Sequence, residues 1–359
     1  GEDGLGFNLI YGDYRYGRHI QNAEATLRGG ADFMQCCTMS GGHQMDLRGE
    51  CDWSDPYVIR GGTARAAQQA FINRTAPNCL GVHFYDEPGL TWWTHPKTGK
   101  GTPHNIPSQD RSFKSAFGED PLQYGDLKPD NSADVARWVQ WGRWKLSFMD
   151  AAWKDARFGV EQVNRELVSV TQSQYGFMAY ADGYYFNVVR SLPAISGHGG
   201  YDDGAASYFW PSYHFEFGRM RDMNKPAWYL PMWYGMPGDL FRLEQYLSFM
   251  VGLQGMAKPP DHQVHNPDAT SSADGILESN KLMARLGTIF NTMPVSRGDV
   301  GLLYSLSQNL GAQVKNMDDN YEGGGHTRAK LLQAYLAGKM IHIPFLPVVE
   351  EDILDGTVA

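Results

Sequence analysis

Long apolar runs, excess basic charge and metal-binding cysteine patterns are all missing from this sequence. No run of 18 apolar residues occurs, so we predict no membrane-spanning helix. The 31 Lys and Arg are outnumbered by 40 Asp and Glu, and the formal net charge is −9. A nucleic-acid partner needs a basic face, so this balance argues against one. Neither a Cys-x-x-Cys pair nor a His/Cys zinc spacing is present, and we predict no metal ion and no cofactor.

Cysteine is scarce, and its four positions leave the redox state open. They are Cys36, Cys37, Cys51 and Cys79. Cys36 and Cys37 are neighbours in an expected strand, so their side chains point to opposite faces of the sheet. A bridge from either one to Cys51 or Cys79 is possible and would suit an exported protein. We therefore expect an extracellular or periplasmic location. The first residues, Gly-Glu-Asp, contain no Met and no signal-like segment, which is typical of a piece of a longer protein.

Aromatic residues are abundant. The chain has 359 residues, 42% of them hydrophobic, and includes ten Trp, 19 Tyr and 17 Phe. This is enough apolar material for one large domain or two ordinary ones. Aromatic side chains fill cores, but exposed flat rings also line sugar-binding clefts, so the composition favours a carbohydrate ligand only weakly.

Residues 81–89 (GVHFYDEPG) are the most informative stretch. An apolar run typical of a buried strand ends in Asp86 and Glu87, and Pro88-Gly89 cannot continue a strand or a helix. In a parallel α/β protein such a strand end lies at the carboxyl edge of the sheet, where ligands bind. The alternative is a strand end capped by two solvated acids. We favour the first interpretation because aromatic residues and histidines follow other strand ends.

Strands and helices alternate along the chain. The predicted strands cover residues 7–11, 31–37, a run ending at 87, 167–171, 192–196, 226–230 and 255–257. The predicted helices include residues 20–27, 64–72, 135–153 with Ser132 as the N-cap, and 276–290. Residues 91–131 interrupt the alternation, and we expect a long lid or binding loop there. Strand-helix alternation of this kind predicts a parallel sheet.

The number of steps predicts the architecture. Seven strand-helix steps fill roughly 290 residues, and an eight-stranded (β/α)8 TIM barrel takes about 250 residues, more with insertions. We expect residues 1–295 to form this barrel, with its first strand missing upstream of Gly1. A second α/β unit, residues 296–359, begins with a strand at 300–304, a helix at 327–336 and an apolar run at 341–349. We expect it to be the truncated beginning of another domain.

With one strand missing, the strand that ends at Glu87 is the fourth of eight. A barrel with an acid at this place resembles the clan-A glycoside hydrolases. Residues 225–228 (KPAW) and the helix over 243–255 resemble the β-galactosidases of glycoside hydrolase family 42. Residues 327–352 are similar to the opening of the amidotransferase-like trimerisation domain that follows the barrel in those enzymes. The resemblance implies a glycosidase that degrades a poly- or oligosaccharide, and a possible homo-oligomer through the second domain.

The resemblance makes Glu87 the general acid/base. Cleavage of a glycosidic bond needs a carboxylic acid that protonates the leaving oxygen, with a pKa raised by apolar or anionic neighbours such as Asp86. The family nucleophile is a Glu at the end of strand seven. Here that place reads Leu230-Pro231-Met232-Trp233, which contains no carboxylate.

Three interpretations remain. Asp202 or Asp203, at the end of another strand, serves as base or nucleophile. Alternatively, Asp86 and Glu87 work with an acetamido group of the substrate, as in hexosaminidases that use an Asp-Glu pair. Or the barrel binds or scaffolds carbohydrate without cleaving it.

Residues near other strand ends are expected to bind the substrate. Trp233 and Tyr234 offer stacking surfaces, and Asp13 and His198 offer hydrogen bonds to hydroxyl groups. The full predicted binding set is Asp13, Trp93, His198, Trp233, Tyr234 and His262. A metal site from His198, Asp202, Asp261, His262 and His265 is an alternative use of these side chains. We do not favour it, because His262 and His265 stand in a Pro-rich loop that does not constrain their geometry.

Overall fold

The computed structural model describes residues 9–12, 27–28, 30, 32–36, 56–84, 107–122, 128, 130–173, 192–198, 225–230, 242–243, 245–246, 249, 255–256, 270–292, 298–315 and 325–358. Its main feature is a seven-stranded sheet in which every strand pairs in parallel with the next one along the chain. The strands are β1 (Leu9–Gly12), β2 (Asp32–Cys36), β3 (Cys79–His83), β4 (Val168–Ser173), β5 (Ala194–His198), β6 (Ala227–Leu230) and β7 (Gly255–Met256).

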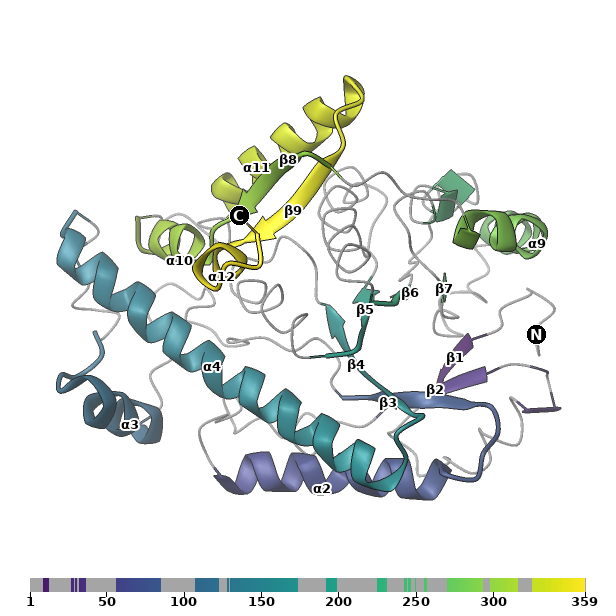
Figure 1. Ribbon diagram of the computed structural model, residues 1–359, viewed down its shortest axis with the longest axis horizontal. Coiled ribbons are helices and arrows are strands. Elements are labelled where there is room, and N and C mark those ends of the chain that lie inside the picture. The colour runs from purple at the N-terminus through teal and green to yellow at the C-terminus, as the bar shows by residue number, and fades with distance from the viewer. Residues whose placement is uncertain are drawn as a thin grey trace.

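All seven predicted strands are confirmed to within a few residues. Figure 1 shows them following one another around a curve, in the sequential order of an α/β barrel. Within the described residues no eighth strand joins β1 or β7. Because every pairing is parallel, the carboxyl ends of all seven strands lie at one edge of the sheet.

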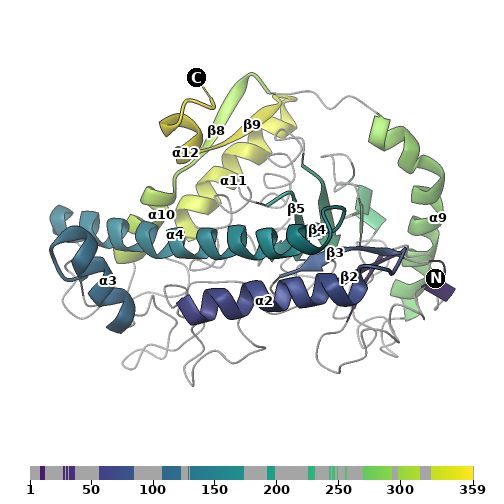
Figure 2. The same cartoon turned by 60° about the horizontal axis from the view of Figure 1, so that its bottom comes forward.

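Two helices cover the outer face of the sheet beside β3. Helices α2 (Pro56–Asn73) and α4 (Ser132–Val163) lie side by side in both views (Figures 1 and 2). Their shared surface is built from small residues, and a Cβ added to Gly159 would lie 2.9 Å from the carbonyl oxygen of Thr63. Close approach of the two backbones therefore depends on the missing side chain of Gly159.

Helix α4 is much longer than the strand it follows. Its 32 residues span about 48 Å at 1.5 Å per residue, whereas a five-residue strand spans about 17 Å. Its carboxyl-terminal half packs on the sheet, with Trp153 and Val160 fully buried. The helix runs antiparallel to the strands. Its amino-terminal half therefore extends past the carboxyl edge of the sheet, where the helices and strands described below pack against it (Figure 2).

The predicted N-cap of this helix was wrong by one residue. Asn131, not Ser132, is the N-cap, with extended backbone angles of φ −92° and ψ 109°. Its side-chain oxygen accepts a hydrogen bond from the Ala133 amide at 3.0 Å. Ser132 is the first helical residue, a position whose side chain does not cap the helix.

Part of the predicted loop at 91–131 is helical. Helix α3 (Pro107–Phe117) begins with Pro at its first position, where the missing amide costs nothing. Phe113 is fully buried and forms a cluster with Trp138 and Trp141 of α4. Arg137 adds an ion pair to Glu119 at 3.2 Å. The expectation of an irregular loop is therefore wrong for 107–117, because tertiary packing on α4 stabilises a helix there.

Helix α9 (Thr270–Thr292) extends the predicted helix at 276–290. Gln245 and Ser279 are buried and hydrogen-bonded to each other, and Arg242 forms an exposed ion pair with Glu278 at 2.6 Å. No helix in the described part of the chain is long and apolar enough to cross a membrane.

The C-terminal unit is a second parallel layer. It consists of β8 (Val300–Tyr304), α10 (Leu306–Lys315), α11 (Gly325–Met340), β9 (Phe345–Val349) and α12 (Glu350–Leu354). Strands β8 and β9 pair in parallel from Val300 opposite Phe345 to Tyr304 opposite Val349. Their inner side chains join the same hydrophobic cluster as Trp153 of α4, so this unit and the main sheet share one continuous core.

The packing of α2 on α4 generates a first prediction. Gly159→Ala should lower the free energy of unfolding by about 1–3 kcal/mol, because the new methyl group meets the Thr63 carbonyl. The matched control is Gly61→Ala on α2, where an added Cβ meets nothing within 4 Å. That change should stabilise by about 0.5–1 kcal/mol through helix propensity alone. Urea unfolding of both variants gives the comparison, and equal effects would contradict the close approach.

The end of α11 generates a second prediction. His342 has φ 61°, in the left-handed region, and the Ile343 amide donates to the Gly338 carbonyl at 2.8 Å, as in a Schellman helix end, where glycine is usual. His342→Gly should raise the free energy of unfolding by up to about 1 kcal/mol. The exposed Ala337→Gly, inside the helix, should lower it by about as much. Destabilisation by His342→Gly in denaturant titration would refute this account.

Candidate functional site

The candidate site is the carboxyl edge of the seven-stranded sheet. Ligands and catalytic residues of parallel α/β proteins gather at this edge because the loops after every strand converge there. The last residues of the seven strands are Gly12, Cys36, His83, Ser173, His198, Leu230 and Met256. The predicted convergence of these strand ends on one edge is confirmed.

One predicted site residue lies within the described part of the chain. His198 is the last residue of β5, and its backbone pairs with Leu230 of β6 at the carboxyl edge, as expected. The others lie outside the described residues: Asp13, Asp86, Glu87, Trp93, Asp202, Asp203, Trp233, Tyr234 and His262. Their assignments stay predictions. In sequence, Asp13 directly follows Gly12, and Glu87 is the fourth residue after His83.

The strand that leads to Asp86 and Glu87 is held firmly. Val82 and Phe84 are fully buried in the cluster shared with α2 and α4, and the Phe84 ring stacks on Trp153 with centroids 6.1 Å apart. The Phe84 amide donates to the Val170 carbonyl at 2.7 Å. The backbone is therefore anchored from both the helix side and the neighbouring strand until two residues before Asp86.

His83 belongs to the candidate site although the sequence did not single it out. Side chains alternate along a strand, so His83, between Val82 and Phe84, faces away from α2 and α4 and into the interior of the curved sheet. It is 2% exposed. The sequence feature that could have identified His83 is its place inside a buried apolar run, between Val82 and Phe84. A buried imidazole at this depth offers a polar group beneath the strand ends.

Cys79 does not form the bridge considered above. It is a buried thiol, not half of a disulfide, and its Sγ lies 3.7 Å from the Gly81 carbonyl oxygen. The pairing of Cys36 or Cys37 with Cys79 is therefore wrong, because this position faces the core beside α2. The pairing with Cys51 concerns side chains outside the described residues.

Over the residues that the structure describes, no group of three or more His, Cys, Asp or Glu side chains is arranged to hold a metal ion. His262, His265 and Asp202, from the alternative metal site, lie outside this range.

Comparison with known proteins gives a likeness in structure only. No protein-family model matches the sequence, and no curated protein matches it either. Many solved structures resemble the fold, and β-galactosidases are among them.

The cold-adapted β-galactosidase from Rahnella sp. R3 is 11% identical, with a TM-score of 0.67, over 97% of this chain and 61% of that one. The β-galactosidase from the psychrophilic Marinomonas ef1 is also 11% identical, with a TM-score of 0.69, over 97% and 66%. The chain thus spans less than two thirds of the length of these β-galactosidases.

A shorter enzyme is similar over nearly its whole length. The GH5_18 protein from Streptomyces cattleya, solved in complex with GlcNAc, is 12% identical, with a TM-score of 0.52, over 99% of this chain and 88% of that one. The β-galactosidases include a GH42 enzyme from G. stearothermophilus. The expected resemblance to clan-A glycoside hydrolases is confirmed, and at this sequence distance what it establishes is the fold: a TIM barrel of the kind those enzymes use.

Proposed function

We propose that this chain is the barrel of a glycoside hydrolase that cleaves O-glycosidic bonds of a poly- or oligosaccharide, with Glu87 as general acid. The observation that carries the proposal is the firmly anchored β3, whose carboxyl end leads within four residues to Asp86 and Glu87. The likeness to glycosidase barrels supports it.

Glu87 would protonate the leaving oxygen of the glycosidic bond. This step needs a carboxylic acid that keeps its proton near neutral pH, which apolar surroundings or a neighbouring negative charge achieve. Asp86 is the neighbouring acid in this proposal. Trp233 and Tyr234, which follow β6 in sequence, would stack on a sugar ring and position the bond to be cleaved.

The second carboxylate is proposed to be Asp203 or Asp202. Both follow β5, the second strand along from β3 in the sheet order. The distance between this carboxylate and that of Glu87 would decide the mechanism, because inverting pairs lie roughly 6.5–9.5 Å apart and retaining pairs roughly 5–5.5 Å.

A sugar-binding barrel without hydrolase activity is the second candidate. The observation in its favour is the sequence after β6, where Pro231, Met232 and Trp233 place no carboxylate. Binding needs only stacking surfaces and hydrogen bonds, which the predicted set supplies. An exported location, an amidotransferase-like second domain and assembly of copies through residues 296–359 also stay predictions.

Glu87→Gln tests the hydrolase proposal. The amide keeps the shape of the side chain but has no transferable proton, so kcat on an unactivated glycoside should fall by about 10²–10⁴-fold. An aryl glycoside with a good leaving group should be affected much less, since its departure needs no protonation. Substrate binding, measured by calorimetry, should survive. Wild-type turnover of the unactivated glycoside would refute the assignment, and binding without turnover in the unmutated protein would favour the sugar-binding barrel.

Asp203→Asn and Asp86→Asn separate the two hydrolytic mechanisms. If Asp203 or Asp202 is the base, its Asn variant should lose activity as severely as Glu87→Gln, because water is no longer activated. If the acetamido group of the substrate takes part instead, Asp86→Asn should be the severe change and activity should require an N-acetylated sugar. Initial rates on matched acetylated and non-acetylated glycosides decide between the two mechanisms. Full activity in Asp202→Asn, Asp203→Asn and Asp86→Asn would exclude both mechanisms.

A further inference from the structure

The inner face of the curved sheet can be followed from strand to strand through the register. Val82 and Phe84 of β3 pack on the outer face with α2 and α4, so His83 between them belongs to the inner face. His83 pairs with Val170 of β4, and Val170 pairs with Ala194 of β5. Paired residues of parallel strands lie on the same face, so Val170 and Ala194 belong to the inner face as well.

One row of paired residues lies two positions further toward the carboxyl edge. Gln172 of β4 pairs with Ser196 of β5. Ser196 pairs with Trp228 of β6, which in turn pairs with Gly255 of β7. Because faces alternate along a strand, this row shares the inner face with Val170. We refer to these four paired residues, each one or two positions before the end of its strand, as the floor row.

The floor row differs in chemistry from the level beneath it. At that lower level the interior is closed, since Val170 is 0% and His83 is 2% exposed. The interior layers of α/β barrels consist mostly of Val, Ile and Leu. In the floor row an amide, a hydroxyl, an indole and a glycine take their place. Polar groups removed from water need hydrogen-bond partners, so this composition suits a ligand-binding surface better than another packed layer.

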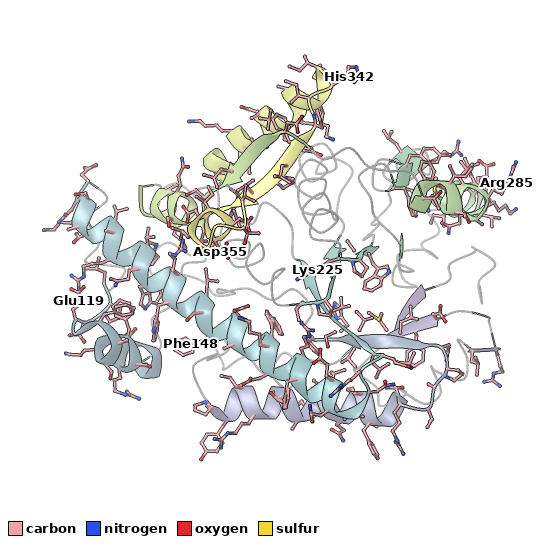
Figure 3. All side chains as sticks on the ribbon, in the orientation of Figure 1. Glu119, Phe148, Lys225, Arg285, His342 and Asp355 are labelled. Atoms are coloured by element: carbon pink, nitrogen blue, oxygen red, sulfur yellow. The ribbon has the colours of Figure 1, made fainter. Side chains whose placement is uncertain are left out.

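Trp228 gives the floor row a flat aromatic surface. It is partly exposed, whereas its neighbour Ala227, on the opposite face of β6, is 2% exposed. In Figure 3 the label of Lys225 marks the chain two residues before β6, beside β5. Gly255 adds no side chain next to Trp228, and glycine inside a strand often marks a place where a ligand approaches the backbone closely. An accessible indole at this level can stack on a sugar ring.

We propose that Gln172, Ser196 and Trp228 form the floor of the sugar-binding site and select the sugar that binds there. The inference rests on the proposed function in one respect, namely that the ligand is a carbohydrate. Trp228 stacks on the apolar face of a pyranose ring, and Gln172 and Ser196 hydrogen-bond to its hydroxyl groups. An amide and a hydroxyl both donate and accept, so this pair distinguishes sugars that differ in the direction of one hydroxyl group.

The competing account is that Gln172 and Ser196 satisfy only each other. Adjacent strands lie about 4.8 Å apart, which is within reach of a hydrogen bond between an amide and a hydroxyl group. In that case the two residues would stabilise the barrel without contacting a sugar. The two accounts differ in one measurable property, because only a floor that contacts the ligand affects discrimination between sugars.

Discrimination between sugars tests the floor row. The probes are the 4-nitrophenyl glycosides of galactose, glucose, mannose and N-acetylglucosamine in both anomers, with kcat/KM measured for each on the full chain. In Gln172→Met and in Ser196→Ala, the ratio of kcat/KM between the preferred sugar and its best competitor should change by about three- to tenfold, because one hydroxyl group loses its partner. Each ratio is measured within one preparation, so partial unfolding lowers both rates equally and leaves the ratio unchanged.

Trp228 variants and a matched serine complete the set. Trp228→Leu should raise KM for all the sugars by about tenfold, whereas Trp228→Phe keeps an aromatic ring and should stay within about threefold. Ser169→Ala is the control, because Ser169 also lies on β4 but pairs with Val82 on the outer face and is 1% exposed. It removes the same hydroxyl group as Ser196→Ala and should leave every ratio unchanged. An equal shift in both serine variants would contradict a role for the inner face.

The outcomes separate this inference from the proposed function. Unchanged ratios in both Gln172→Met and Ser196→Ala would overturn the floor row alone, because the unmutated chain would still act on its sugar. If the chain binds sugars without turnover, calorimetric dissociation constants of the same free sugars supply the ratios. Absence of both turnover and binding for every probe would remove the carbohydrate ligand, and with it both the proposed function and the floor row.

Discussion

The packing of α4 against β3 and α2 is the contact on which the other parts of this protein depend. The Phe84–Trp153 stack and the close approach at Gly159 hold the helix on the outer face of the sheet. The same contact anchors β3, the strand that leads to Asp86 and Glu87. Without this packing, β3 would lose its support beneath the candidate site. Helix α3 and the C-terminal unit, which pack on α4, would lose their connection to the sheet through that helix.

The length of α4 lets one helix serve three structural purposes. Its carboxyl-terminal half belongs to the barrel, and its amino-terminal half supports α3 through the cluster of Phe113, Trp138 and Trp141. Between these parts, Arg143 and Gly142 hold the C-terminal unit. The hydrophobic core continues from the sheet through α4 into β8 and β9. Among the described residues, α4 therefore contacts both the main sheet and the C-terminal unit.

The fold and the chemistry rest on different observations. Seven parallel strands and the likeness to glycosidase barrels establish where a site would lie. They do not establish which reaction occurs there, because one barrel fold supports many reactions. The decisive groups are the carboxylates, and the residues after β6 contain none where a retaining clan-A enzyme would need its nucleophile. Under the hydrolase proposal, activity therefore needs a second carboxylate from another part of the chain, for which Asp202 and Asp203 are the candidates.

Much of the fold could be predicted because its signals are local. Short apolar runs bounded by Gly, Pro and Asp placed all seven strands, and the three- and four-residue spacing of Val135, Trp138 and Gly142 placed α4. The carboxyl edge as the candidate site followed from parallel pairing alone. An error of one residue at the N-cap arose because Asn131 and Ser132 are both good caps, and local sequence does not choose between them.

Tertiary structure decided the features that depend on distant neighbours. Helix α3 forms because α4 offers Trp138 and Trp141 to Phe113, and Cys79 stays a thiol because the fold places it in the core. The position of His83 on the inner face of the sheet could be assigned only because α2 and α4 pack on the opposite face. Arg143 meets Glu350 across 207 positions of sequence. Such pairings are invisible to local patterns, because periodicity and propensity describe a residue's near neighbours, whereas close packing brings together whichever side chains share the same space.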